Sequence, residues 1–149
     1  MDFDSHMGRA LEAARDAAAR GEVPVGAVIV RGGAVIARAG NRTVELHDPT
    51  AHAEILAIRA AGKVLQSQRL TGCDLYVTLE PCAMCAGAIA FARIERLYIG
   101  AEDAKGGAVL NGPRFFSQPT CLHVPQVYDG FSAGEAGDLL RDFFAARRN

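Results

Sequence analysis

The alternation of strand-like and helix-like segments constrains the fold of this 149-residue chain more than any other feature. Apolar residues at helical spacing predict a first helix over residues 5–20. Two segments rich in β-branched residues, 25–31 and 34–38, then flank Gly32-Gly33, a pair that tolerates the positive φ values of tight turns. These two segments are predicted to form an antiparallel hairpin.

The rest of the chain continues the alternation. Helical patterns cover residues 51–61 and 82–92, and strand patterns cover residues 74–79, 96–100 and 123–128. Residues 102–118 are rich in Gly and Pro, which predicts loops with at most one short helix. Ser132 and Glu135 have the spacing of a capping box, ahead of a C-terminal helix. The order of segments predicts one α/β domain over residues 1–149, a three-layer α/β/α sandwich with a mixed sheet of about five strands.

Composition and charge exclude several classes of protein. Half of the residues are hydrophobic and 22% are charged, which is ordinary for a folded globular chain. No segment has the apolar length of a membrane span, and the N-terminus lacks the basic flank of a signal peptide, so we expect a cytoplasmic protein without membrane association. The net charge of −1 offers no global attraction to phosphates. Any binding of RNA must therefore rest on local basic patches.

Two short motifs carry the chemistry. Thr-Ala-His-Ala-Glu at residues 50–54 and Glu-Pro-Cys-Ala-Met-Cys at residues 80–85 each open a predicted helix. Together they supply an imidazole from His52, thiolates from Cys82 and Cys85, and a carboxylate from Glu54. Zinc accepts nitrogen and sulfur ligands in a tetrahedron, and a catalytic zinc keeps its fourth position for water. Three protein ligands would leave that position open.

The spacing of the four residues predicts their placement. Cys82 and Cys85 are three residues apart, so on a helix they point to the same side. Their place in the first turn favours the thiolate form, because the helix dipole is positive there. His52 and Glu54 are two apart, which in the middle of a helix would put them on different faces. We therefore expect them at a helix start, where the geometry is looser.

The chemistry predicts a division of labour. Zinc lowers the pKa of a bound water toward about 7, which makes hydroxide available at neutral pH. Glu54 would take the water's proton, deliver it to a ring nitrogen and then protonate the departing amine. The products would be a keto base and ammonia.

The Cys-x-x-Cys pair alone is also typical of redox proteins and of structural zinc sites in binding modules without catalysis. A structural site would need a fourth ligand, for which Cys73 and Cys121 are the candidates, although both are predicted to be small buried residues. His-x-Glu about thirty residues upstream of Pro-Cys-x-x-Cys matches the signature of zinc deaminases. A purely redox protein would leave the His-x-Glu pair unexplained. The remaining histidines, His6, His47 and His123, lack ligand spacing and are predicted to be packed or solvated.

The two motifs resemble the cytidine-deaminase-like superfamily, and more closely the bacterial tRNA-specific adenosine deaminases, which convert the wobble adenosine of an anticodon to inosine. The resemblance extends through GEVPVGAVIV, GNRT, DPTAHAEILAIR, LYVTLEPCAMCAGAIAFARI, GAEDAKGGAV and LLRDFFAARR. It implies a cytidine-deaminase-like fold and one zinc ion per subunit, held by His52, Cys82 and Cys85, with Glu54 as proton shuttle. It also implies a homodimer that binds a tRNA anticodon stem-loop.

The resemblance also implies contacts with the substrate. Asn41 would hydrogen-bond the flipped base, beside a pocket that includes Val25, Ala27 and the backbone of Ala53. The implied RNA contacts are Asp103, Lys105, Phe144, Arg147 and Arg148. Helix packing is the alternative explanation for Phe144. Favourable charge at the end of a helix would equally explain the two terminal arginines.

The sequence departs from the family pattern between Val109 and Tyr128, where Val109-Leu110-Asn111 and Cys121-Leu122-His123 replace the usual residues. This departure puts contacts with the anticodon loop in doubt and leaves the metal motif untouched. A deaminase of free guanine, cytosine or a nucleoside is the alternative function, because it would use the same zinc site with a pocket closed over the base.

Overall fold

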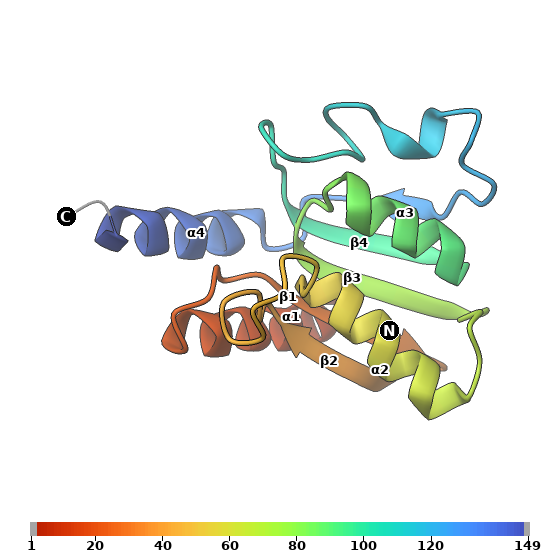
Figure 1. Ribbon diagram of the computed structural model, residues 1–149, viewed down its shortest axis with the longest axis horizontal. Coiled ribbons are helices and arrows are strands. Elements are labelled where there is room, and N and C mark those ends of the chain that lie inside the picture. Colours follow the sequence, from red (N-terminus) through yellow and green to blue (C-terminus); the bar gives the residue numbers. More distant parts are fainter. Residues whose placement is uncertain (1–2, 148–149) are drawn as a thin grey trace.

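A computed structural model describes residues 3–147, with the backbone alone for residues 3–5. Within these residues, five strands form one sheet in the order β2-β1-β3-β4-β5 (Figure 1). Their bounds are β1 Gly26–Arg31, β2 Ala34–Gly40, β3 Cys73–Leu79, β4 Arg96–Ala101 and β5 Gln126–Tyr128. β1 runs antiparallel to both β2 and β3, whereas β3, β4 and β5 are parallel. The predicted mixed sheet is confirmed.

In the part of the chain that the structure describes, four α-helices cover the two faces of the sheet. Their bounds are α1 Phe3–Ala19, α2 Ala53–Leu65, α3 Ala83–Ala92 and α4 Ala133–Arg147, and a short 3-10 helix, η1, spans Phe115–Ser117. α1 and α4 lie on one face, and α2 and α3 lie on the other, in front of the sheet in Figure 1. The predicted three-layer α/β/α sandwich is confirmed. None of these helices is both long and apolar enough to cross a membrane.

Each face of the sheet has its own hydrophobic core, because successive side chains of a strand point to opposite faces. Ile29 of β1 packs with α2 and α3, whereas its neighbour Val28 packs with α1. Gly26 allows α1 to lie close to β1, since a Cβ at this position would be 1.9 Å from the carbonyl oxygen of Ala10. The close approach of α1 therefore requires glycine at the start of β1.

The turn glycines behave as the sequence predicts. Gly32 and Gly33 have φ values of 59° and 81°, and they connect β1 to β2 as a tight hairpin. Positive φ at both central residues is the signature of the turn whose twist matches that of the paired strands.

Several boundaries differ from the sequence-based expectations. α2 begins at Ala53 and continues beyond Gly62 to Leu65. It ends where Gln66 takes a left-handed φ of 51° and its amide bonds the carbonyl of Gly62. An internal glycine is therefore tolerated, and a left-handed glutamine ends the helix instead. The last strand is also shorter than predicted, because only residues 126–128 pair with β4.

The predicted capping box at the start of α4 is wrong. Ser132 has a φ of 56°, in the left-handed region, whereas a capping residue takes an extended conformation. The carboxylate of Glu135 pairs with Arg15 of α1. The start of α4 is therefore tied to a neighbouring helix by an ion pair.

Candidate active site

Two helix starts bring the metal-binding motifs together. His52 is the N-cap of α2 and Cys82 is the N-cap of α3, and both have extended backbones with φ of −74°. Glu54 and Cys85 follow within the first turns of the same helices. The expectation that His52 and Glu54 lie at a helix start is confirmed. The unpaired amides of both helices favour negative charge at this point, which suits thiolate ligands.

The spacing of the donor atoms fits a zinc ion. Nδ1 of His52 lies 3.5 Å from Sγ of Cys85 and 3.7 Å from Sγ of Cys82. Tetrahedral zinc, with Zn–N of about 2.0 Å and Zn–S of about 2.3 Å, places a nitrogen and a sulfur ligand about 3.6 Å apart. The three donor atoms all lie within 4.8 Å of one another. The donor set and its dimensions are therefore those of a zinc site.

The group has three members among the described residues, so it matches a catalytic rather than a structural site. Cys73 is fully buried in the core beneath α2 and α3. Cys121 is half-buried, and its thiol contacts the carbonyl oxygen of His123 at 3.1 Å. Neither cysteine joins the metal group, so the described residues supply it with three protein ligands.

Hydrogen bonding within the group sets the ionisation of the thiols. The thiol of Cys85 and the ring of His52 lower the pKa of Cys82 to about 4. The hydrogen bond with Cys82 and burial raise the pKa of Cys85. The hydrogen bond with Cys82 also raises the pKa of His52. Cys82 is thus a thiolate at neutral pH before any metal binds, and a divalent cation would ionise its neighbour.

Glu54 is the buried carboxyl of the site. Its residue is only 4% exposed, and burial raises its pKa to about 7. A carboxyl with this pKa exchanges protons readily near neutral pH, which is the property of a general acid and base. Its side chain lines the same cavity as His52 and Cys82.

That cavity has a volume of about 350 Å³, enough for a nucleobase. Its lining consists of Val23, Val25, Asn41, Thr43, His52, Glu54, Leu79, Glu80, Cys82, Asp103, Gly106, Leu140 and Phe144. Oδ1 of Asn41 accepts a hydrogen bond of 2.8 Å from the amide of Ala53. The amide group Nδ2 of Asn41 is then the donor that remains for a ligand.

The structure brings together most of the predicted substrate residues. Asn41, Val25, Asp103 and Phe144 line the cavity. Ala27 and Ala53 are fully buried and lie outside its lining.

The other implied RNA contacts lie elsewhere. Lys105 is exposed beyond the rim. The guanidinium of Arg147 stacks on the ring of Phe143, 3.6 Å from its centroid. Arg148 lies outside the described residues.

Sequence reasoning missed Glu80, which organises the rim of the cavity. Glu80 is 2% exposed, and its Oε2 accepts hydrogen bonds from the amides of Val109, Leu110 and Asn111 at 2.9–3.1 Å. Its Oε1 accepts from the amide of Asp103 at 2.9 Å and from the side chain of Asn111 at 2.8 Å. Its position directly before Pro81-Cys82 is the signal that could have found it. One carboxylate therefore ties the divergent segment to the metal motif.

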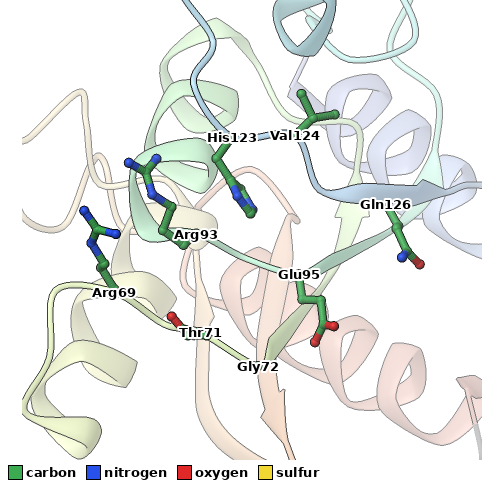
Figure 2. Close-up of a pocket in the computed structure, with 8 residues that line it drawn as sticks. All are labelled: Arg69, Thr71, Gly72, Arg93, Glu95, His123, Val124 and Gln126. Carbon is green, nitrogen blue, oxygen red and sulfur yellow. The ribbon is translucent and has the colours of Figure 1, made fainter.

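A second hollow lies at the opposite end of the parallel strands, where β3, β4 and β5 begin, and its lining excludes the metal group. Its side chains diverge: Arg69 and Arg93 turn to one side, and Glu95 and Gln126 turn to the other (Figure 2). The ring of His123 is held by a contact of 2.7 Å with the carbonyl oxygen of Ile94. This hollow offers no converging set of catalytic groups.

Known proteins share long stretches of this sequence. A model of the cytidine and deoxycytidylate deaminase zinc-binding region matches residues 2–101. A tRNA-specific adenosine deaminase of Agrobacterium fabrum is 63% identical over 139 residues, which cover 93% of this chain and 91% of that protein. The chain belongs to the tRNA-specific adenosine deaminase family. Another member, from Aquifex aeolicus, is 46% identical over 140 residues, covering 94% of this chain and 92% of that protein.

Solved structures of this family and its neighbours have the same fold. One, from work on A-to-I editing by tRNA:A34 deaminases at the wobble position of transfer RNA, has a TM-score of 0.90 and 62% identity. It covers 91% of this chain and 99% of that one. A guanine deaminase from Nitrosomonas europaea has a TM-score of 0.84 at 26% identity and covers 97% of this chain and 85% of that one. Zinc is the cofactor of this deaminase domain, as the His, Cys and Cys donors indicate.

Proposed function

We propose that the protein hydrolyses the wobble adenosine of tRNA to inosine, with release of ammonia. One observation carries this proposal: a three-ligand metal group, the buried Glu54 and the free donor of Asn41 converge on one cavity of about 350 Å³. The 63% identity with a tRNA-specific adenosine deaminase supports adenosine in tRNA as the substrate. Such a substrate would place the enzyme in the cytoplasm.

His52, Cys82 and Cys85 would hold one zinc ion through Nδ1 and two sulfur atoms. Bound zinc supplies Lewis-acid activation of a water molecule. Glu54 would take one proton of the attacking water and deliver it to the ring nitrogen next to the reacting carbon. It would then take the second proton, from the hydroxyl added at that carbon, and deliver it to the amine, which leaves as ammonia while the carbonyl forms. A pKa of about 7 suits Glu54 to both the acid and the base role.

The other lining residues would bind and orient the base. Nδ2 of Asn41 donates to an acceptor on the base, because its Oδ1 is already bonded to Ala53. The apolar side chains of Val25 and Leu79 provide surfaces for the ring. Burial of the base among these residues excludes bulk water, which strengthens each polar contact.

We also propose that the protein is a homodimer formed through α3. The sequence of this helix, AMCAGAIAFA, has no polar side chain apart from the metal-binding cysteine, so both of its faces are apolar. Its outer stripe includes Met84, Gly87 and Phe91, and the side chain of Phe91 is 79% exposed. Leu122, which is 82% exposed, lines the same shallow depression as Gly87 and Phe91. A helix that is apolar all round is normally buried, and a second copy would cover this stripe.

Deamination of a free base is the second candidate. Leu140 and Phe144 of α4 line the cavity, so the C-terminal helix partly covers the position of the base. The guanine deaminase from Nitrosomonas europaea shares the fold at 26% identity. A covered pocket favours a small substrate, whereas the 63% identity with a tRNA-specific adenosine deaminase favours tRNA.

A competition assay separates the two candidates. The zinc-loaded protein would be offered an anticodon stem-loop with a wobble adenosine, together with free adenine, guanine, cytosine and their nucleosides. We expect inosine in the RNA and no turnover of the free compounds. Turnover of guanine with intact RNA would overturn the tRNA assignment and leave the zinc chemistry standing.

A further inference from the structure

A basic groove lies next to the base cavity. It has a volume of about 590 Å³ and runs over the end of α1, the edge strand β2 and the outer face of α2. Its charged lining residues are Arg20, Arg38, Arg42, Arg59, Lys63 and Glu45. The lining thus holds five cations and one carboxylate, with Asp16 beside it paired to Arg38, in a chain whose net charge is −1. This is a local concentration of positive charge of the kind that binds phosphates.

The groove and the base cavity share a wall. Asn41 and Thr43 line the cavity, whereas Gly40 and Arg42 line the groove. Alternate residues of one short segment therefore face the two depressions. A polymer whose base enters the cavity could continue directly into the groove.

Hydrogen bonds hold this wall in place. Nη2 of Arg20, at the groove side, donates to the carbonyl oxygen of Asn41 at 3.3 Å. The amide of Arg42 donates to the carbonyl oxygen of Ala51 at 3.0 Å, directly before His52. The groove is therefore fixed relative to the base-binding asparagine and to the metal motif.

The ion pairs in and beside the groove do not neutralise all of its positive charge. Arg42 and Arg20 share Glu45, at 2.7 Å and 3.6 Å, and Arg38 pairs with Asp16 at 2.8 Å. The side chains of these pairs are 41–60% exposed, so each pair contributes little stability and exchanges readily with another anion.

The outer face of α2 carries the other two of the five cations. Arg59 and Lys63 are exposed and four residues apart, so they project from the same face of the helix. They extend the positive surface away from the shared wall.

We propose that this groove binds the phosphate backbone of the RNA whose base occupies the cavity. The inference rests on the proposed function and deepens it, because it assigns a polynucleotide rather than a free base to the site. A free base has no phosphate to place against these cations. An RNA strand carries one phosphate per nucleotide, so it can neutralise several of them at once.

Salt dependence of RNA binding tests the groove. The probe is a stem-loop with guanosine at the wobble position, which measures binding without turnover, and the variant is Arg59→Gln with Lys63→Gln. The slope of log K against log salt is negative, and loss of two phosphate contacts should reduce its magnitude by about 1.4 to 1.8. At low salt we expect the affinity of this variant for the stem-loop to fall about tenfold or more. Its loss of deamination should appear as a rise in KM.

The matched control removes the same charge at the other end of the sheet. Arg31 is exposed at the end of β1, opposite the start of β3, and exposed Arg69 lies in the loop before β3. Arg31→Gln with Arg69→Gln should bind with the slope of the wild type. Glu45→Gln should tighten binding, because it frees Arg20 and Arg42.

The outcomes separate this inference from the proposed function. An unchanged slope and affinity in the groove variant would refute the groove, even if the wild type converts a wobble adenosine. A wild type that converts no RNA would refute the proposed function, and the binding slopes would still decide the groove. Equal losses in the groove variant and its control would show a general charge effect and would also refute the groove.

Discussion

Oδ1 of Asn41 accepts a hydrogen bond of 2.8 Å from the amide of Ala53, the residue between His52 and Glu54. Since an amide N–H can only donate, this bond fixes the orientation of the Asn41 carboxamide. In the proposed function, base recognition by Asn41 would thereby be tied to the first turn of α2, which also carries the proposed zinc ligand and the proposed proton-transfer carboxyl. A movement of that turn would disturb all three together.

Asn41→Asp tests the donor role of this residue. Aspartate can still accept from Ala53, but an oxygen replaces Nδ2 and faces the acceptor on the base. We expect kcat/KM to fall by about 10²-fold or more, because an unpaired buried polar group opposes the substrate. A thermal melt should show a folded protein. Activity within threefold of the wild type would show that Asn41 does not donate to the base.

Metal content tests the ligand set. Cys82→Ser and His52→Ala should each reduce bound zinc from about one ion per chain to near zero, because two protein ligands hold zinc far less well than three. Cys121→Ser is the matched control, since its thiol contacts a backbone carbonyl outside the metal group. Metal analysis after dialysis gives the readout. Full zinc occupancy in either ligand variant would contradict the assignment.

Glu80→Gln tests the carboxylate that ties the rim to the metal motif. Its Oε2 accepts from three backbone amides, and an NH₂ group in place of one oxygen would face N–H donors. We expect the free energy of unfolding to fall by about 3 kcal/mol. Glu102→Gln is the control, because Glu102 is exposed and accepts one bond from Asn111; it should cost within about 0.5 kcal/mol. Equal effects of the two variants on denaturant unfolding would contradict the account.

The same variant predicts a pH dependence. Burial tends to raise the pKa of Glu80, but the hydrogen bonds from Asp103 and Asn111 outweigh it, so the pKa lies below its ordinary value. Glu80 therefore contributes its stability in full above the unfolded pKa of about 4.3, and this contribution is lost as pH falls through the lower folded pKa. The stability difference between wild type and Glu80→Gln should be constant near neutrality and shrink in acid. A difference that grows below pH 4 would have the wrong sign.

Phe91→Asp tests the proposed dimer. A charge in the centre of the apolar stripe of α3 should prevent its burial against a second copy, and light scattering should show half the mass of the wild type. Val64→Asp is the control, because Val64 is 59% exposed on α2, outside the stripe. A monomeric wild type, or an intact dimer in Phe91→Asp, would contradict the proposal.

Sequence reasoning predicted the features that depend on local chemistry. The hairpin follows from two glycines that accept positive φ, and the metal group follows from three residues whose spacing suits two helix starts. The start of α4 was predicted wrongly, because Glu135 forms an ion pair with Arg15 of α1. A capping pattern read from neighbouring residues does not reveal a contact with another helix.

Features built from distant segments were missed for the same reason. Glu80 accepts hydrogen bonds from backbone amides of a loop more than twenty residues further along the chain. The basic groove joins the end of α1, the edge of β2 and one face of α2. Only the packed sheet brings these segments together.

The most direct test of the central claim is the product formed from an anticodon stem-loop with a single adenosine at the wobble position. Wild-type protein with zinc should convert that adenosine to inosine with equimolar ammonia, as measured by nuclease digestion and mass spectrometry. Glu54→Gln should retain zinc and RNA binding and lose about 10²–10⁴-fold in rate, because no carboxyl is left to move the proton. Unchanged adenosine with the zinc-loaded wild type, or undiminished turnover by Glu54→Gln, would contradict the account.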